Sequence, residues 1–194
     1  MEEKLLTRRH ALRTLGAVAA TGVLDWAAIA QAGHEAHAAA QSSEPINYTL
    51  LGAADAADVE ALTSQIIPSD DTPGAREAGV TFFIDRALGS FFAHWRPGFM
   101  QGLAGFQAAV RAAHPHAASF AALSAERQIE FLHSVDRTPF FEQARLLTAC
   151  GMFSNPSYGG NRGGIGWKLL GFEDQHIFEP PFGYYDQGYD DRAP

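Results

Sequence analysis

Apolar residues recur at steps of three and four along most of the chain, which is the spacing of one helix face. In the first such segment, residues 55–67, Asp55 is a suitable N-cap and Pro68 ends the helix. Ser124 and Thr138 can cap two later helices, and a proline after Thr138 fits the first helical position. We see no sustained period-two alternation, so the pattern predicts a mainly α-helical, compact domain of about five helices. The predicted helical segments are 55–67, 80–88, 99–110, 124–135 and 138–150.

After Gly151 this pattern gives way to a glycine-rich loop at residues 155–167. A phosphate-binding loop would need a lysine directly after its last glycine, and a dinucleotide fingerprint would follow a strand. Neither condition is met, so we expect these glycines to serve tight turns and close contacts. From about residue 173 an irregular C-terminal tail interleaves aromatic residues with Gly, Pro and Asp. Those aromatic rings need a surface to cover, either on this domain or on another chain.

Residues 1–40 have the pattern of an export signal. Basic residues precede a mildly apolar, alanine-rich stretch, and the pair Arg8-Arg9 stands directly before it. This pair is typical of the twin-arginine pathway of bacteria, which carries folded proteins. Cleavage after Ala40 fits the small-residue rule, as does cleavage after Ala30. We therefore divide the chain into a signal peptide at 1–40 and one helical domain at 41–194.

Composition narrows the function classes. The chain has 194 residues, a formal net charge of -8 and one cysteine. The acidic balance argues against a nucleic-acid partner, which needs a clustered basic face. One cysteine excludes a disulfide within the chain, a multi-cysteine metal site and a c-type haem motif. The signal segment holds as many acidic as basic side chains, so its removal leaves the net charge unchanged.

No pattern of residues predicts a catalytic centre, a cofactor site or a metal site in this chain. The histidines and acidic pairs are scattered, without the spacing of a ligand set. The alternative that stays open is a stand-alone exported enzyme or metal-binding protein that uses scattered His, Asp and Glu. Cys150 has two interpretations: a buried small hydrophobe, or an intermolecular disulfide with another exported chain.

Two segments resemble the gluconate 2-dehydrogenase subunit 3 family, over roughly residues 50–172. The first is Ile66-Ile67-Pro68-Ser69-Asp70-Asp71-Thr72-Pro73-Gly74-Ala75, followed by Ala78-Gly79-Val80 and Phe83-Ile84-Asp85. The second is Asn155-Pro156-x-Tyr158-Gly159-Gly160-Asn161-Arg162-Gly163-Gly164-x-Gly166-Trp167-Lys168-x-x-Gly171-Phe172. The twin-arginine leader fits the family as well.

The resemblance implies a non-catalytic small subunit of a membrane-associated sugar or polyol dehydrogenase that acts on CH–OH donors. A large partner subunit would carry FAD, and a cytochrome subunit with haem c often passes the electrons onward. The small subunit would carry the export signal and escort the flavoprotein through the twin-arginine translocase. The complex would then work in the periplasm, at the face of the inner membrane. We expect the partner interface at Cys150, Asn155, Tyr158, Gly159, Gly160, Asn161, Arg162, Gly163, Gly164 and Trp167, with Cys150 as the possible intersubunit disulfide.

Overall fold

The computed structural model describes residues 47–175 and 177. The predicted signal peptide and nearly all of the aromatic tail lie outside these residues. Within them the chain forms six α-helices and three short 3-10 helices, without a strand. No α-helix of the described part combines the length and the apolar character needed to cross a membrane. The elements are α3 (Ala53–Ile66), α4 (Val80–Gly89), η1 (Ala93–Trp95), α5 (Arg96–Ala113), α6 (Ala125–Val135), α7 (Pro139–Phe153), η2 (Pro156–Tyr158), η3 (Arg162–Gly164) and α8 (Ile165–Leu170).

The mainly helical fold predicted from the sequence is confirmed, and its five helices correspond to α3–α7. Ser124 and Thr138 are the N-caps of α6 and α7, and their hydroxyl oxygens accept backbone N–H groups at 3.5 and 3.3 Å. The expected cap at Asp55 is wrong: α3 begins at Ala53 after Gly52, because two alanines extend the helix toward its N-terminus. The sixth helix, α8, lies inside the glycine-rich segment that we expected to be irregular.

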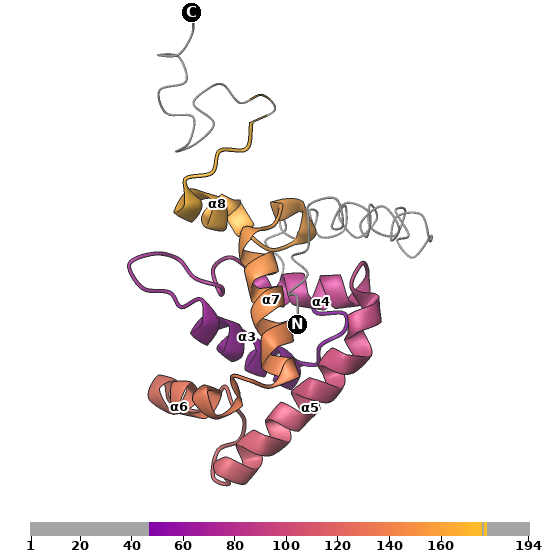
Figure 1. Ribbon diagram of the computed structural model, residues 1–194, viewed down its shortest axis with the longest axis vertical. Helices are drawn as coiled ribbons and strands as arrows, with labels where there is room; N and C mark the ends of the chain where they lie inside the picture. Colours follow the sequence, from indigo (N-terminus) through magenta and orange to yellow (C-terminus); the bar gives the residue numbers. More distant parts are fainter. Residues whose placement is uncertain (1–46, 176, 178–194) are drawn as a thin grey trace, which may run out of the picture.

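Helix α7 runs through the middle of the domain and contacts α3, α4, α5 and α8 (Figure 1). Helix α6 packs against α3 at one end of the molecule, and α8 lies at the opposite end, against α7 (Figure 1). The first segment that resembles the family runs from the end of α3 into α4, and the second follows α7 and includes α8. The helical bundle holds both of them near one end of the domain.

Phenylalanine rings fill much of the core. The Phe106 ring lies 5.0 Å from that of Phe120 and 5.5 Å from those of Phe131 and Phe140, in edge-on or tilted arrangements. Phe99 is fully buried, and its ring lies 5.4 Å from that of Phe140. Such geometries add to the free energy gained by burying apolar area. This cluster joins α5, α6 and α7 with the loop between α5 and α6.

Two buried carboxylates tie loops to the bundle. Asp58 on α3 accepts the backbone N–H of Ala121 at 2.9 Å, in the loop before α6. Asp85 on α4 is fully buried and accepts four hydrogen bonds from residues 49–51. Three of these come from consecutive backbone N–H groups, each at 2.8 Å, and the fourth from the Thr49 hydroxyl at 2.9 Å. The chain that enters the domain from the N-terminal side is thus fixed to the middle of α4.

Candidate partner interface

The glycine-rich segment 155–171 follows α7 as two 3-10 turns and one short helix. Gly159 ends η2 with a φ of 94°, and Gly164 opens α8 with a φ of 67°. Side chains rarely adopt these left-handed conformations, so glycine is needed at both turns. The dense glycines predicted a loop, and the structure places a helix after the last of these turns.

Asn161 is the centre of this segment. It is fully buried and, at φ 45°, it is the described non-glycine residue with a positive φ. Its side-chain amide donates to the carbonyl of Ser154 at 2.9 Å, and its Oδ1 accepts the N–H of Gly166 at 2.7 Å. Its own N–H donates to the carbonyl of Gly151 at 2.8 Å. Asn161 therefore joins the end of α7 to the start of α8.

Two glycines allow the segment to lie directly on the backbone of α7. A Cβ on Gly160 would stand 2.2 Å from the carbonyl oxygen of Gly151. A Cβ on Gly166 would stand 1.9 Å from the carbonyl oxygen of Met152. Real Cβ atoms do not approach an oxygen this closely. The close approach that we expected of these glycines thus occurs within the chain, and contact with a partner stays a prediction.

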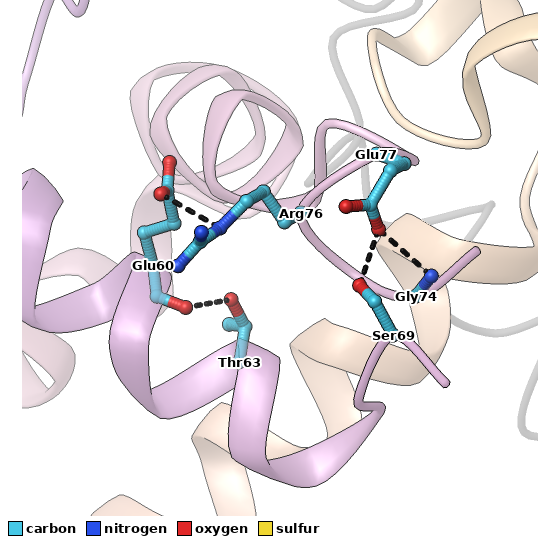
Figure 2. A network of polar contacts seen from close by, with 6 residues as sticks. All are labelled: Glu60, Thr63, Ser69, Gly74, Arg76 and Glu77. Atoms are coloured by element: carbon cyan, nitrogen blue, oxygen red, sulfur yellow. Dashed lines mark hydrogen bonds and ion pairs between the residues drawn. The ribbon is translucent and has the colours of Figure 1, made fainter. Parts of the chain in front are cut away.

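The other family-like segment is a turn closed by its own polar side chains (Figure 2). One carboxylate oxygen of Glu77 accepts the Ser69 hydroxyl at 2.5 Å and the backbone N–H of Gly74 at 2.9 Å. These hydrogen bonds, the Ser69 bond first, hold the pKa of Glu77 below its usual value. Arg76 reaches back to Glu60 of α3, with its Nε 3.1 Å from the carboxylate (Figure 2). The turn between α3 and α4 is thereby fixed to the helix that precedes it.

The two family-like segments are in direct contact. The backbone N–H of Arg162 donates to the carbonyl of Ala78 at 3.1 Å. Gly79 has a φ of 70°, and a Cβ there would stand 2.4 Å from the Nε of Arg162. The missing side chain of Gly79 thus leaves the space in which the Arg162 side chain lies. Segments far apart in the sequence form one unit at this end of the domain.

A family comparison covers this unit together with the rest of the helical domain. The family model described as gluconate 2-dehydrogenase subunit 3 matches residues 53–174, more than half of the chain and both segments. The chain belongs to the gluconate 2-dehydrogenase subunit 3 family. No curated protein and no solved structure gave a significant match. The match identifies the chain as a subunit of a dehydrogenase complex of the gluconate 2-dehydrogenase type.

In this subunit 3 chain, Cys150 lies in the last turns of α7 as a free, half-buried thiol. Burial raises the pKa of this thiol above its ordinary value, so the thiolate is disfavoured. Leu146 precedes it by four residues on the same face of α7, and its side chain is 49% exposed. The thiol is therefore next to exposed apolar surface and not within a closed core.

The two aromatic residues predicted for the subunit 3 interface lie partly within the domain. The Tyr158 ring is 5.5 Å from that of Phe91. The Trp167 indole donates to the carbonyl of Phe153 at 2.9 Å, which leaves part of its ring exposed. Asn155 is exposed, and its Oδ1 accepts the N–H of Ser157 at 2.9 Å as the cap of η2. Among the predicted glycines, Gly163 is exposed and Gly164 half-buried, whereas Gly159 and Gly160 are buried.

Four exposed large apolar side chains lie at the end of the glycine-rich segment or just after it, and none of them is among the residues expected at the interface. We call them the α8 apolar patch: Leu169, Leu170, Phe172 and Ile177, which are 46%, 64%, 45% and 77% exposed. The two leucines occupy the unspecified positions between Lys168 and Gly171 in the quoted pattern. Adjacent leucines directly before a helix-ending glycine were the signal that could have indicated them, because a six-residue helix cannot bury both.

The described residues bring no set of three His, Cys, Asp or Glu side chains together as a metal site. An apolar groove of about 450 Å³ lies between α5 and α7, lined by Gly98, Gly102, Gly105 and Phe106 among others. It is separate in sequence from the family-like segments. The strongest candidate for a functional surface is therefore the end of the domain where these segments, Cys150 and the α8 apolar patch follow one another along the chain.

Proposed function

We propose that this chain is the non-catalytic small subunit of an exported, FAD-dependent sugar or polyol dehydrogenase. In this function it escorts the flavoprotein subunit through the twin-arginine pathway and then stays in the complex. FAD would be bound by the large subunit, and haem c by a cytochrome subunit where one is present. The complex would act on CH–OH donors in the periplasm, at the inner membrane.

The observation that carries this proposal is the family match, which covers the folded domain from α3 to the end of α8. The α8 apolar patch adds physical support. Exposed leucine and phenylalanine side chains that follow one another on one short segment are typical of a surface that another protein covers. The patch begins in the last residues of the glycine-rich segment, so docking there would bring the partner against both.

The N-terminal segment supports the export step. Arg8-Arg9 before a mildly apolar stretch has the pattern of a signal for the export of folded proteins. A partner that docks on the folded domain before export would travel with it. Cys150, beside exposed Leu146, would then be able to form a disulfide with that partner in the oxidising periplasm.

Co-expression with the flavoprotein subunit of the proposed complex tests the escort function. The full chain should bring the flavoprotein and its activity into the periplasmic fraction, because the only export signal is on this subunit in the proposal. Deletion of residues 1–40, or replacement of Arg8 and Arg9 together by lysine, should retain the flavoprotein inside the cell. Arg13→Lys is the matched control, since it changes a basic residue of the same segment outside the pair. Full export of active flavoprotein with the deletion variant would refute the escort function.

A non-reducing gel of the purified complex tests the disulfide. A band at the summed mass of the two chains should appear, and Cys150→Ser should remove it. If the unmutated complex runs only as separate chains, Cys150 is not an intersubunit link. That result leaves the escort proposal unaffected, because docking on the α8 apolar patch does not need the thiol.

A further inference from the structure

Two arginines from different segments cover one phenylalanine ring. The guanidinium carbon of Arg86, on α4, lies 5.0 Å from the centroid of Phe82, and that of Arg162, on η3, lies 5.2 Å from it. Phe82 is 2% exposed, so the two side chains and their surroundings close it off from water. Arginine often packs on an aromatic ring in this way, and such packing leaves the edge of each guanidinium free to donate hydrogen bonds.

Neither guanidinium has an anionic partner among the described residues. The two ion pairs found there involve Arg76 and Arg145 instead. Among the described residues, Arg86 donates one long hydrogen bond, 3.4 Å, to the carbonyl of Asn47. The Nε atoms of both arginines are buried without an acceptor. Burial of a charge without a counter-charge costs free energy.

The surroundings select the kind of anion that would fit. Burial lowers the pKa of Arg162, and the Tyr48 phenol is the group that acts on it electrostatically. A carboxylate has one charge and two oxygens, and it matches the fork of a guanidinium.

We propose that Arg86 and Arg162 form a carboxylate-binding site that takes an acidic side chain of the flavoprotein subunit. This inference rests on the proposed function and locates part of its interface. Arg162 lies within the glycine-rich segment, between the buried Asn161 and the start of α8, so its backbone is held in place by the fold, and its side chain packs on Phe82. In a subunit of net charge -8, two arginines that contact the same ring, neither in an ion pair with a described residue, are a local contrast that an acidic segment would recognise.

Carbodiimide coupling in the co-expressed complex tests the site directly, because it joins a lysine to a carboxylate in contact with it. The chain has two lysines, Lys4 in the predicted signal and the exposed Lys168, so the background is low. Arg162→Lys should give a coupled peptide that links position 162 to an acidic residue of the flavoprotein, identified by mass spectrometry. Arg86→Lys repeats the test from the other side if the first variant does not fold. Arg137→Lys, at an exposed position between α6 and α7, is the matched control.

Each outcome separates the source of the carboxylate from the existence of the site. Coupling to an acidic residue of this same chain would overturn the flavoprotein as the source. Coupling no greater than that of the Arg137→Lys control would overturn the site itself. If the two chains do not associate at all, the proposed function fails. Without a complex, the site itself can still be tested in the isolated chain. Coupling of position 162 to a carboxylate of the same chain would show that the two arginines bind one, and no coupling would overturn the site.

Affinity gives an independent measurement. Arg162→Gln should weaken the complex by about tenfold or more at low salt, the effect of losing one charge-assisted hydrogen-bonded contact, and by less at high salt. Arg137→Gln should leave the affinity unchanged. Equal affinities for Arg162→Gln and the unmutated chain would show that the two arginines only pack against Phe82.

Discussion

Between α3 and α7 the chain buries large side chains, whereas between Asn155 and Gly171 it packs by leaving side chains out. In the bundle, phenylalanine rings from three helices meet at centroid distances of 5.0–5.5 Å. In the glycine-rich segment, backbone lies against backbone, and Asn161 supplies the hydrogen bonds that side-chain burial does not. The first region is stabilised by the burial of large side chains, and the second by close backbone packing that the absence of Cβ atoms allows. The same kind of substitution should therefore act differently in the two regions.

The largest effect is expected in the bundle. Phe99→Ala removes a fully buried ring that contacts Phe140, and it should lower the free energy of unfolding by about 3–5 kcal/mol. Urea denaturation of the purified subunit, followed by circular dichroism, measures this loss. A change below 1 kcal/mol would mean that burial of the Phe99 ring contributes little to stability. The proposed contrast between a bundle stabilised by buried rings and a segment stabilised by close backbone packing would then be wrong.

A smaller and more local effect is expected at the end of α7. Gly166→Ala places a methyl group against the carbonyl of Met152, and only a movement of the backbone can relieve this clash. The substitution should lower the free energy of unfolding by about 1–3 kcal/mol. Hydrogen exchange should show faster opening of α8, with α3 and α5 protected as before. If the amides of α5 exchange faster by the same factor, the segment and the bundle unfold as one unit.

Cys150 should react slowly with iodoacetamide in the folded subunit. Burial raises the pKa of its thiol, so the reactive thiolate forms at higher pH than in the unfolded chain. The unfolded state therefore loses the proton first, and stability should fall as the pH rises through the ordinary thiol pKa, until the folded thiol also ionises. Labelling rates with iodoacetamide between pH 7 and 10, in buffer for the folded chain and in urea for the unfolded chain, measure the difference in thiol reactivity. Equal rates in the two conditions would contradict a raised thiol pKa in the folded subunit.

The smallest effect has the opposite sign. Gly105 is an exposed residue inside α5, and a Cβ added there meets nothing within 4 Å. Gly105→Ala should stabilise the subunit by about 0.5–1 kcal/mol, because alanine is the better helix former. Thermal denaturation beside Gly166→Ala gives the direct comparison of one substitution in two regions. A lower midpoint for Gly105→Ala would be inconsistent with open space at this position.

Most of the bundle could be predicted from the sequence because its information is local. Three- and four-residue apolar spacing, the caps Ser124 and Thr138, and the stop before Pro68 are each contained in a few neighbouring residues. The cap expected at Asp55 was wrong because the preference for aspartate at the N-cap did not take account of two alanines before it, which extend the helix. Helix α8 was missed since its start depends on Asn161 and its position on the end of α7, which are tertiary contacts.

In the candidate site, too, local features could be predicted from the sequence and tertiary contacts could not. The family-like segments could be found from their residues, and their contact through Arg162 and Ala78 could not, because it joins parts of the chain that no spacing rule relates. Asp85 stood within the quoted pattern, yet its four hydrogen bonds to residues 49–51 appear only in three dimensions. The pair of Arg86 and Arg162 was hidden for the same reason.

Asp85 also determines how the domain responds to a mechanical load. A pull on the chain before residue 49 reaches the fold through the long Arg86 contact with Asn47, the packing of Tyr48 on the core and the Asp85 carboxylate. The hydrogen bonds of Asp85 to three consecutive N–H groups share that load. The helix that takes up the tension is α4, which also carries Phe82 and Arg86 and packs against α7. If the leader is drawn through a membrane channel as proposed, the force is delivered to the helix that shares the carboxylate-binding site. The pulling force of export and the proposed contact of Arg86 with the flavoprotein would then both act on the ten residues of α4.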